Sequence, residues 1–215
     1  MKISDPGNID PHSITNIIFD WGGVLVHIDP NATISAFRKL GIENFRSYYN
    51  YGIQNEFFTR FEIGKVSSDQ LRQYIRDALN SNVTDDAIDN AWCAMVLDIP
   101  QPYIETLLRL RSKYRLILLS NTNQIHEDLI LPRLKRDVGR DFLSLFDRYY
   151  FSHHLGMRKP DREIFEYVLR DSGAKAEETL FIDDTEVNTD VAAELGIRSY
   201  YLQPGSDISV LFRKW

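Results

Sequence analysis

Four short strand-like segments, each followed closely by a polar residue, constrain the fold of this chain more than any other feature. The runs at 116–119 and 180–182 are apolar throughout, which is typical of strands covered on both faces in a parallel sheet. Segments with apolar residues three and four apart lie between the runs, as on one face of a helix. Strands that alternate with helices indicate an α/β fold with a doubly wound parallel sheet. We expect the strands near residues 16–20, 115–120, 148–152, 179–183 and 198–202.

The helices between these strands are predicted from the same spacing. One helix has both ends marked, because Asp161 is suited to cap its N-terminus and Gly173 its C-terminus. Another precedes the strand at 115–120, and a third ends at Gly196. The third helix has apolar positions that we expect to face the core: Val187, Val191, Ala192 and Leu195.

The interval from Asp29 to Pro100 breaks the alternation, because it contains helical patterns and no convincing strand. Ser67 with Gln70 three residues later is typical of a capping box at a helix start. Four helices inserted after the first strand would lie over the carboxyl edge of the sheet and could close on a ligand there. We therefore expect a helical cap domain at 29–100 and an α/β core formed by 1–28 and 101–215. The predicted cap helices cover 31–40, 43–61, 69–80 and the segment that begins at Thr84.

Composition and charge argue against several classes of partner. The chain has 215 residues and a net charge of −6, with no basic cluster, so nucleic acid and anionic membranes are poor partners. No stretch approaches the roughly 20 apolar residues of a membrane span, and the polar residues 1–16 are unlike a secretory signal. The single cysteine, Cys93, excludes an internal disulfide. We expect a cytoplasmic protein that is a monomer or a weak dimer.

Asp20 closes the first predicted strand and is followed by Trp21, Gly22 and Gly23. The ordinary role of such an Asp is to cap the turn with side-chain hydrogen bonds. The functional alternative is a nucleophile that attacks phosphorus and forms an aspartyl-phosphate. Paired glycines favour the second role, because they let the backbone approach a ligand closely.

Asp183 and Asp184 follow the fourth predicted strand. As an isolated pair they would fit a solvated turn. After a buried strand they indicate a metal site, since Mg²⁺ prefers oxygen ligands and usually takes one or two carboxylates. Asp20 and Asp184 would supply the carboxylates, and a carbonyl of the glycine-rich turn a third oxygen.

Ser120 and Lys159 also follow strand-like runs. The ordinary interpretation is a polar exit from a strand and a surface lysine. The alternative is a hydroxyl and backbone N–H groups at 120–123 that bind phosphate oxygens, with the Lys159 ammonium as a point charge on the phosphoryl group. Together with the three carboxylates, these groups are the parts needed to handle a phosphate with a divalent metal.

These segments resemble the four motifs of the haloacid dehalogenase-like superfamily, the aspartate-nucleophile phosphohydrolases. The resemblance covers nearly the whole core, and it implies a Rossmann-like sheet of strand order 5-4-1-2-3 with a helical cap of the family's first class. It also implies a Mg²⁺-dependent phosphatase that acts on a small phosphorylated metabolite. The motif-like segments occur in the family's order at 19–25, 118–121, 158–165 and 181–184, with Asn188 four residues later.

The resemblance implies a role for each matching position. Asp20 would be the nucleophile and a metal ligand, Gly22 would offer its carbonyl to Mg²⁺, and Asp184 would bind the metal directly. Asp183, directly or through water, and Asn188 would support this site. The phosphate would be held by Ser120, Asn121 and Lys159.

Gly22 is the main departure from the family pattern, since most of its phosphatases carry a second Asp there that protonates the leaving oxygen. General acid–base help is typically worth about 10²–10⁴ in rate. His27 or Asp29 could reach in to replace it. A substrate with a better leaving group is the other explanation, and a subgroup of sugar-1-phosphate phosphatases resembles this chain in having Gly at this position. We therefore expect a sugar 1-phosphate as substrate.

Two other functions stay open. A 2-haloacid dehalogenase also lacks the second Asp, but Asp183 and Asp184 argue against it, because dehalogenation needs no metal. A non-catalytic member that binds a phosphorylated ligand or a protein would explain Gly22. It would not explain the presence of Asp20, Lys159 and Asp184.

Substrate choice would depend on the cap around residues 54–62. Phe57, Phe58 and Phe61 are at helical spacing and also fit the interior of the cap. The candidate specificity residues are Asn55, Phe57, Phe58, Arg60 and Glu62.

The histidines contribute less to the prediction. His126, His153 and His154 have no partner at a spacing typical of metal ligands. We expect them to be loop residues or to support neighbouring groups.

Overall fold

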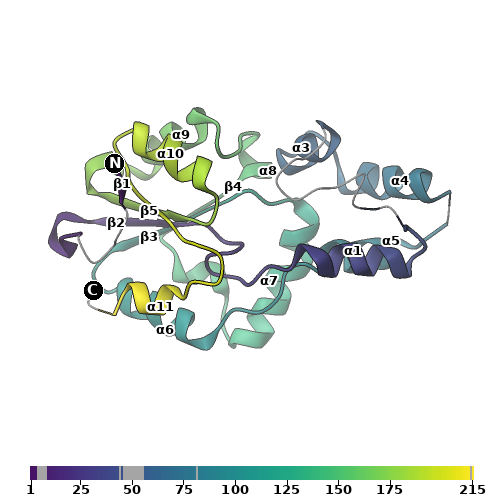
Figure 1. Ribbon diagram of the computed structural model, residues 1–215, viewed down its shortest axis with the longest axis horizontal. Coiled ribbons are helices and arrows are strands. Elements are labelled where there is room, and N and C mark those ends of the chain that lie inside the picture. The colour runs from purple at the N-terminus through teal and green to yellow at the C-terminus, as the bar shows by residue number, and fades with distance from the viewer. Residues whose placement is uncertain (4–8, 44, 46–55, 81, 214) are drawn as a thin grey trace.

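The computed structural model describes residues 1–3, 9–43, 45, 56–80, 82–213 and 215. Within these residues the chain forms one six-stranded parallel sheet of order β1-β6-β5-β2-β3-β4 (Figure 1). The strands are β1 (Lys2–Ile3), β2 (Asn16–Phe19), β3 (Arg115–Ser120), β4 (Arg148–Phe151), β5 (Thr179–Asp183) and β6 (Arg198–Tyr201).

The predicted doubly wound sheet is confirmed. The five predicted strands correspond to β2 through β6, and their order in the sheet is the expected 5-4-1-2-3. β1 adds an edge strand beside β6 that the sequence did not predict, because two residues are too few to show a periodic pattern.

Helices cover both faces of the sheet, because alternate strand residues point to opposite sides. Ile17 and Phe19 pack in the apolar cluster that includes residues of α6, α7 and α11, whereas Ile18 packs with residues of α9 and α10. Among the described helices, none combines the length and the apolar character needed to cross a membrane. The core helices are α6 (Gln101–Leu110), α7 (Gln124–Val138), α8 (Ser152–Leu155), α9 (Arg162–Ser172), α10 (Glu186–Glu194) and α11 (Ile208–Leu211), with short 3₁₀ turns at Pro11–Ser13, Phe142–Leu145 and Ala176–Glu178.

The insertion after β2 is helical, as predicted, and lies beyond the carboxyl edge of the sheet (Figure 1). Its two connections to the core run side by side, because Ile28 and Val96 form an antiparallel bridge. α5 packs on α7, and α3 packs on α8. The helices are α1 (Pro30–Lys39), α3 (Glu56–Glu62), α4 (Ser68–Leu79) and α5 (Asp85–Cys93).

Most of the predicted cap features are found. Ser67 and Gln70 form the expected capping box at the start of α4. The predicted helix 43–61 corresponds in part to α3, while 44 and 46–55 lie outside the described residues. The apolar cluster under the sheet continues into the cap through residues such as Phe58 and Trp92. A separate domain at 29–100 therefore stays a prediction.

Two local predictions about the core helices need correction. Val187 does not face the core but is 49 % exposed and lines a pocket. Asn188 is buried instead, because its side chain donates a hydrogen bond to Asp183 at the end of β5. Asp161 occupies the N-cap position of α9, but its side chain makes no capping hydrogen bond.

Thr33 provides a test of how the cap is held together. Its fully buried hydroxyl donates to the Trp92 carbonyl and accepts from the Met95 N–H, both at 3.0 Å, so it ties α1 to the end of α5. We predict that Thr33→Val lowers the free energy of unfolding by about 1–3 kcal/mol, because two buried backbone groups each lose one hydrogen bond. Thr33→Ser keeps the hydroxyl and should cost less. Urea unfolding measures both variants, and equal losses would contradict the prediction.

Candidate active site

The carboxyl ends of three neighbouring strands bring the predicted site residues together. β2 lies between β3 and β5, with Phe19 paired to Leu118 on one side and to Ile182 on the other. The residues just beyond these positions therefore meet at one edge of the sheet, where parallel α/β sheets bind their ligands. They are Asp20, Ser120, Asp183 and Asp184.

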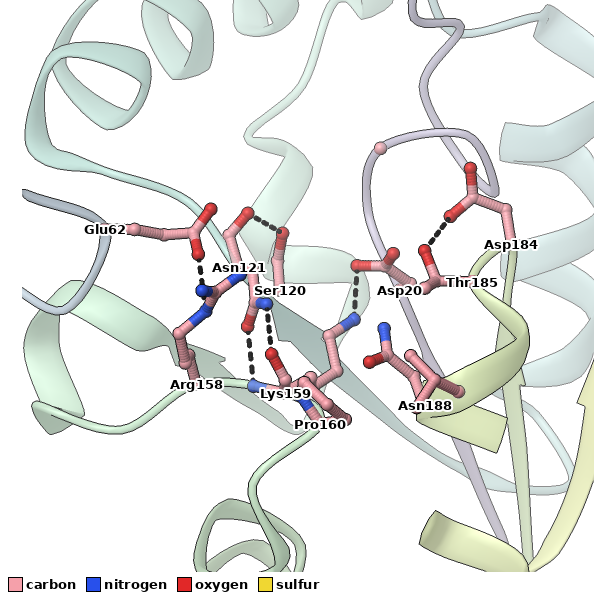
Figure 2. Close-up of a pocket in the computed structure, with 12 residues that line it drawn as sticks. Asp20, Glu62, Ser120, Asn121, Arg158, Lys159, Pro160, Asp184, Thr185 and Asn188 are labelled. Atoms are coloured by element: carbon pink, nitrogen blue, oxygen red, sulfur yellow. Dashed lines mark hydrogen bonds and ion pairs between the residues drawn. The ribbon is translucent and has the colours of Figure 1, made fainter. Parts of the chain in front are cut away.

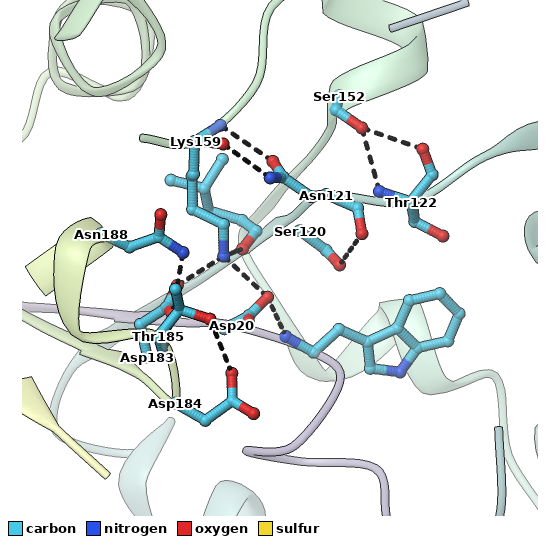
Figure 3. A network of polar contacts seen from close by, with 12 residues as sticks. Asp20, Ser120, Asn121, Thr122, Ser152, Lys159, Asp183, Asp184, Thr185 and Asn188 are labelled. Carbon is cyan, nitrogen blue, oxygen red and sulfur yellow. Dashed lines mark hydrogen bonds and ion pairs between the residues drawn. The ribbon is translucent and has the colours of Figure 1, made fainter. Parts of the chain in front are cut away.

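Lys159 joins this edge from the loop after α8, and its side chain is 1 % exposed. Its ammonium lies 2.8 Å from Asp20 Oδ1 and 2.6 Å from Asp183 Oδ2, and it donates to the Leu119 carbonyl at 3.1 Å (Figure 3). Burial alone would lower the pKa of Lys159, but the two carboxylates outweigh burial and raise it. Lys159 is therefore a buried ammonium whose charged form is favoured by its two carboxylate partners.

Asp183 is fully buried and has partners on both oxygens. Oδ1 accepts from the Thr185 N–H at 2.8 Å and from the Asn188 side chain at 2.9 Å, while Oδ2 faces Lys159 (Figure 3). Asn188 thus fixes the Asp183 carboxylate, and Asp183 in turn fixes the Lys159 ammonium. This position suits the supporting role expected for both residues.

The three carboxylates of the site lie close to one another. One oxygen each of Asp20, Asp183 and Asp184 falls within 4.8 Å of the others. Burial raises the pKa of Asp20 to about 8, against the opposing effect of Lys159, and the other two carboxylates add to the rise. Burial and then Asp183 raise the pKa of Asp184 to about 6. Three acidic groups around one ammonium have the charge and the oxygen donors that suit a divalent cation.

Gly23 is required by the position of Asp184. Its φ is +75°, and a Cβ on this residue would overlap Asp184 Oδ2. Gly22 is less constrained, since a Cβ there would meet only the Ile28 side chain, at 3.2 Å. The expected contribution of the Gly22 carbonyl to a metal site stays a prediction.

A pocket of about 180 Å³ opens above these residues (Figure 2). It is small beside ligand pockets of about 300–1,000 Å³, which suits a small metabolite. Besides the residues already described, the pocket is lined by Glu62 of the cap and by Arg158, the neighbour of Lys159. The residues that line it are Asp20, Gly22, Glu62, Ser120, Asn121, Arg158, Lys159, Pro160, Asp184, Thr185, Val187 and Asn188.

Glu62 and Arg158 form an ion pair that crosses from the cap to the core. Arg158 Nε lies 2.8 Å from Glu62 Oε2, and the two side chains are only 26 % and 13 % exposed (Figure 2). The cap is also fixed here by Ser152 Oγ, which donates to the Glu62 carbonyl at 2.6 Å. Glu62 is one of the five cap residues predicted to set specificity, whereas Arg158 was given no role. Their pairing could not be predicted, because almost one hundred residues separate them.

Ser120 and Asn121 have different environments. The Ser120 hydroxyl lies in the pocket lining, as expected for a phosphate contact. The side chain of Asn121 instead braces the backbone of Lys159: its Nδ2 donates to the Lys159 carbonyl at 2.8 Å, and its Oδ1 accepts from the Lys159 N–H at 2.9 Å. A phosphate contact by Asn121 stays a prediction that would depend on its backbone.

The suggested replacements for the missing acid lie elsewhere. His27 pairs with Asp98, 3.2 Å away, and Asp29 caps α1 by accepting from the Asn31 N–H. Neither side chain lines the pocket. They lie away from the pocket because 27–29 form the connection to the cap, which hydrogen-bonds along the returning segment 95–98.

The other cap candidates divide into interior and surface residues. Phe58 is buried and Phe57 stacks on Tyr74, so both belong to the interior of the cap. Arg60 is exposed and does not line the pocket. Asn55 lies outside the described residues.

Comparison with known proteins identifies the family. A family model described as haloacid dehalogenase-like hydrolase matches residues 14–196. The chain belongs to this family. It is 32 % identical over 194 residues to a D-ribitol-5-phosphate phosphatase of Bacteroides thetaiotaomicron, which covers 90 % of this chain and 94 % of the relative.

Solved structures agree with this assignment. A family enzyme from Bacteroides thetaiotaomicron, crystallised with magnesium and inorganic phosphate, is 38 % identical with a TM-score of 0.87, over 93 % of this chain and all of that one. A 2-haloacid dehalogenase from Pseudomonas syringae is 19 % identical with a TM-score of 0.57, over 90 % of this chain and 89 % of that one. The latter likeness shows a shared fold alone.

Gly23 allows a test of the acidic site. We predict that Gly23→Ala raises the Mg²⁺ concentration needed for half-maximal activity by about tenfold or more, because the new methyl group displaces the Asp184 carboxylate. Gly139→Ala is the matched control, since Gly139 has a φ of +73° with nothing within 4 Å of the added Cβ. Both variants suffer backbone strain, but only the first should change the Mg²⁺ requirement. The same Mg²⁺ requirement in both would contradict the prediction.

Proposed function

We propose that this protein is a Mg²⁺-dependent phosphatase of a small sugar or polyol phosphate that works through an aspartyl-phosphate on Asp20. The observation that carries the proposal is the meeting of Asp20, Asp183 and Asp184 around the buried ammonium of Lys159, at the floor of a small pocket. The phosphatase activity named for the relative, which this chain matches over almost its full length, supports the same chemistry.

The acidic cluster fits a magnesium ion. The three carboxylates carry more negative charge than Lys159 offsets. The absence of a Cβ at Gly23 leaves the space that the Asp184 carboxylate occupies. Asp20 and Asp184 would hold the ion, with the Gly22 carbonyl as a third protein ligand. A bound Mg²⁺ would neutralise charge on the phosphate and orient it.

Asp20 is oriented for attack on phosphorus. Its Oδ1 accepts from the Trp21 N–H at 2.7 Å and contacts Lys159 at 2.8 Å. Its Oδ2 makes no hydrogen bond with the described residues and is the oxygen proposed to form the bond to phosphorus as the bond to the leaving oxygen breaks. Ser120 and Lys159 would hold the phosphoryl oxygens during transfer. The leaving oxygen takes a proton from solvent water, since Gly22 offers none. A water molecule then attacks the phosphorus, the bond from phosphorus to Asp20 breaks, and inorganic phosphate and free Asp20 are released.

The substrate beyond the phosphate would contact the Glu62–Arg158 pair. Among the described residues that line the pocket, the charged side chains other than Asp20, Lys159 and Asp184 are these two. A guanidinium donates and a carboxylate accepts, so together they suit the hydroxyl groups of a polyol. Ribitol 5-phosphate, named for the relative, is such a molecule, with its phosphate on a primary hydroxyl. The sugar 1-phosphate expected from Gly22 stays a prediction to be tested beside it.

The remaining expectations also belong to the proposal. The single cysteine and the net charge of −6 support a cytoplasmic protein that does not bind nucleic acid. We propose a monomer or a weak dimer.

The nucleophile is tested by phosphate release. We predict that purified protein with Mg²⁺ releases phosphate from sugar and polyol phosphates, that chelation stops the release, and that Asp20→Asn lowers its rate by at least about 10³-fold. Asp29→Asn is the matched control, because an Asn can still cap α1. Activity that survives in Asp20→Asn would remove the nucleophile, and a fully inactive wild-type protein would favour a non-catalytic binder.

The cap–core pair is tested by comparing substrates. We predict that Glu62→Gln raises the KM for a polyol phosphate by about 10- to 100-fold, the range for a lost charge-assisted hydrogen bond. Release from p-nitrophenyl phosphate, which has no hydroxyl groups, should change much less. Glu56→Gln, on the exposed start of the same helix, is the control. Equal losses on both substrates would mean that Glu62 holds the cap and does not contact substrate.

A further inference from the structure

Two histidines and a glutamate converge at a second place in the molecule. His153 and His154 are adjacent on α8, and Glu127 lies in the first turn of α7. The Nε2 atoms of both imidazoles lie 2.8 Å from the same oxygen, Glu127 Oε2. One ligand atom from each of the three residues falls within 4.8 Å of the others. No partner for the histidines could be predicted, because Glu127 precedes His153 by 26 residues.

The cluster is rigid on its inner side. The ring of Phe151 stacks on His153 with centroids 5.8 Å apart and lies tilted against His154 at 5.6 Å. Ser152, the preceding residue, accepts from the Thr122 N–H at 2.9 Å and donates to the Glu62 carbonyl. Gly64 of the cap packs so closely on the His153 carbonyl that a Cβ there would overlap it. The ligand atoms are thus held by two core elements and braced by the cap.

The cluster is open on its outer side. The His153 side chain is 3 % exposed, whereas that of His154 is 42 % exposed. Both histidines line a groove of about 380 Å³ between the core and cap residues 61–69. Gln124, Ser67 and Asp69 add polar groups to this groove. An ion could therefore approach both imidazoles through this groove, and the Glu127 carboxylate, which is 19 % exposed, lies 2.8 Å from both Nε2 atoms. Water from the groove could fill its remaining coordination positions.

The donor set differs from that of the catalytic site. Imidazole nitrogens suit zinc and neighbouring transition metals, whereas an all-oxygen set suits Mg²⁺. Two imidazoles and one carboxylate are also a common set of three protein ligands for zinc. With metal–ligand distances of about 2.0–2.2 Å, a tetrahedral site has its ligand atoms about 3.3–3.6 Å apart. The two nitrogen–oxygen separations of 2.8 Å would need to widen by about 0.5–0.8 Å.

We propose that Glu127, His153 and His154 form a second metal site, which binds a divalent transition-metal ion such as Zn²⁺ and joins α7 to α8 beside the cap. The competing explanation is a triad in which both imidazoles donate hydrogen bonds to Glu127. The two explanations differ in one measurable property. The metal site requires the Glu127 charge and both imidazoles for ion binding, whereas the triad predicts no ion binding at all.

Cobalt is a suitable probe, since Co²⁺ takes the same ligands as Zn²⁺ and its bound form absorbs visible light. The full-length protein is titrated with Co²⁺ in excess Mg²⁺, which occupies the carboxylate site. We expect one Co²⁺ per chain, and we expect Glu127→Gln and His154→Gln each to weaken binding by at least tenfold. Asp184→Asn, which alters the Mg²⁺ site, and His12→Gln, an exposed histidine elsewhere, should bind Co²⁺ as the wild type does.

Thermal unfolding of the same proteins gives a second measurement. Zn²⁺ should raise the unfolding temperature of the wild type but not of Glu127→Gln or His154→Gln, as expected for an ion that binds the folded state alone. Unchanged Co²⁺ affinity in these two folded variants, or a wild type that binds no Co²⁺ in excess Mg²⁺, would overturn the proposal. Neither measurement depends on phosphate release, so this proposal and the proposed phosphatase activity can fail separately.

Discussion

The ammonium of Lys159 is the group on which the rest of this site depends. A charge buried to this degree costs several kcal/mol unless it is well paired. Here the ammonium pairs with Asp20 and Asp183 and donates a hydrogen bond to the Leu119 carbonyl. One side chain therefore connects the carboxyl ends of β2, β3 and β5. Asn121 then fixes its backbone, and Thr185 and Asn188 fix Asp183. The strand ends are thereby held in the arrangement that brings the carboxylates together.

The carboxylates repel one another, whereas Lys159 attracts them. Burial and mutual repulsion raise the pKa values of Asp20 and Asp184, which is a cost that the protein carries when no further cation is near. Gly23 keeps Asp184 in this unfavourable position, since any side chain there would push it away. Carboxyl groups with pKa values raised by burial and by neighbouring carboxylates are typical of functional sites.

Much of the fold and of the site floor could be predicted from the sequence. Apolar strands such as 116–119 leave little choice of burial, and in a parallel sheet their carboxyl ends must share one edge. The strand order 5-4-1-2-3, which the resemblance to the family implied, then predicted that Asp20, Ser120 and Asp184 lie side by side on this edge. Features that depend on neighbouring residues alone could also be predicted, as with the capping box of Ser67 and Gln70 at the start of α4.

The cap–core ion pair that lines the pocket and the cluster of two histidines and a glutamate could not be predicted, because each joins segments that are distant in sequence. Glu62 meets Arg158, and Glu127 meets His153 and His154, only after the cap and core have packed. No periodicity records such contacts. Asn121 illustrates the same limit within a motif: its position next to Ser120 suggested a phosphate contact, but its side chain binds the Lys159 backbone. The guess about His27 and Asp29 failed because closeness in sequence to Gly22 does not fix the direction of a side chain.

Thermal unfolding of Lys159→Met, with and without Mg²⁺, tests the central claim most directly. If Lys159 offsets the acidic cluster, its loss should lower the free energy of unfolding by about 3–5 kcal/mol in the absence of metal, as for a buried ion pair that loses one partner. Mg²⁺ should then raise the unfolding temperature of the variant more than that of the wild type. A variant that unfolds at the wild-type temperature and gains no more from Mg²⁺ would contradict this account.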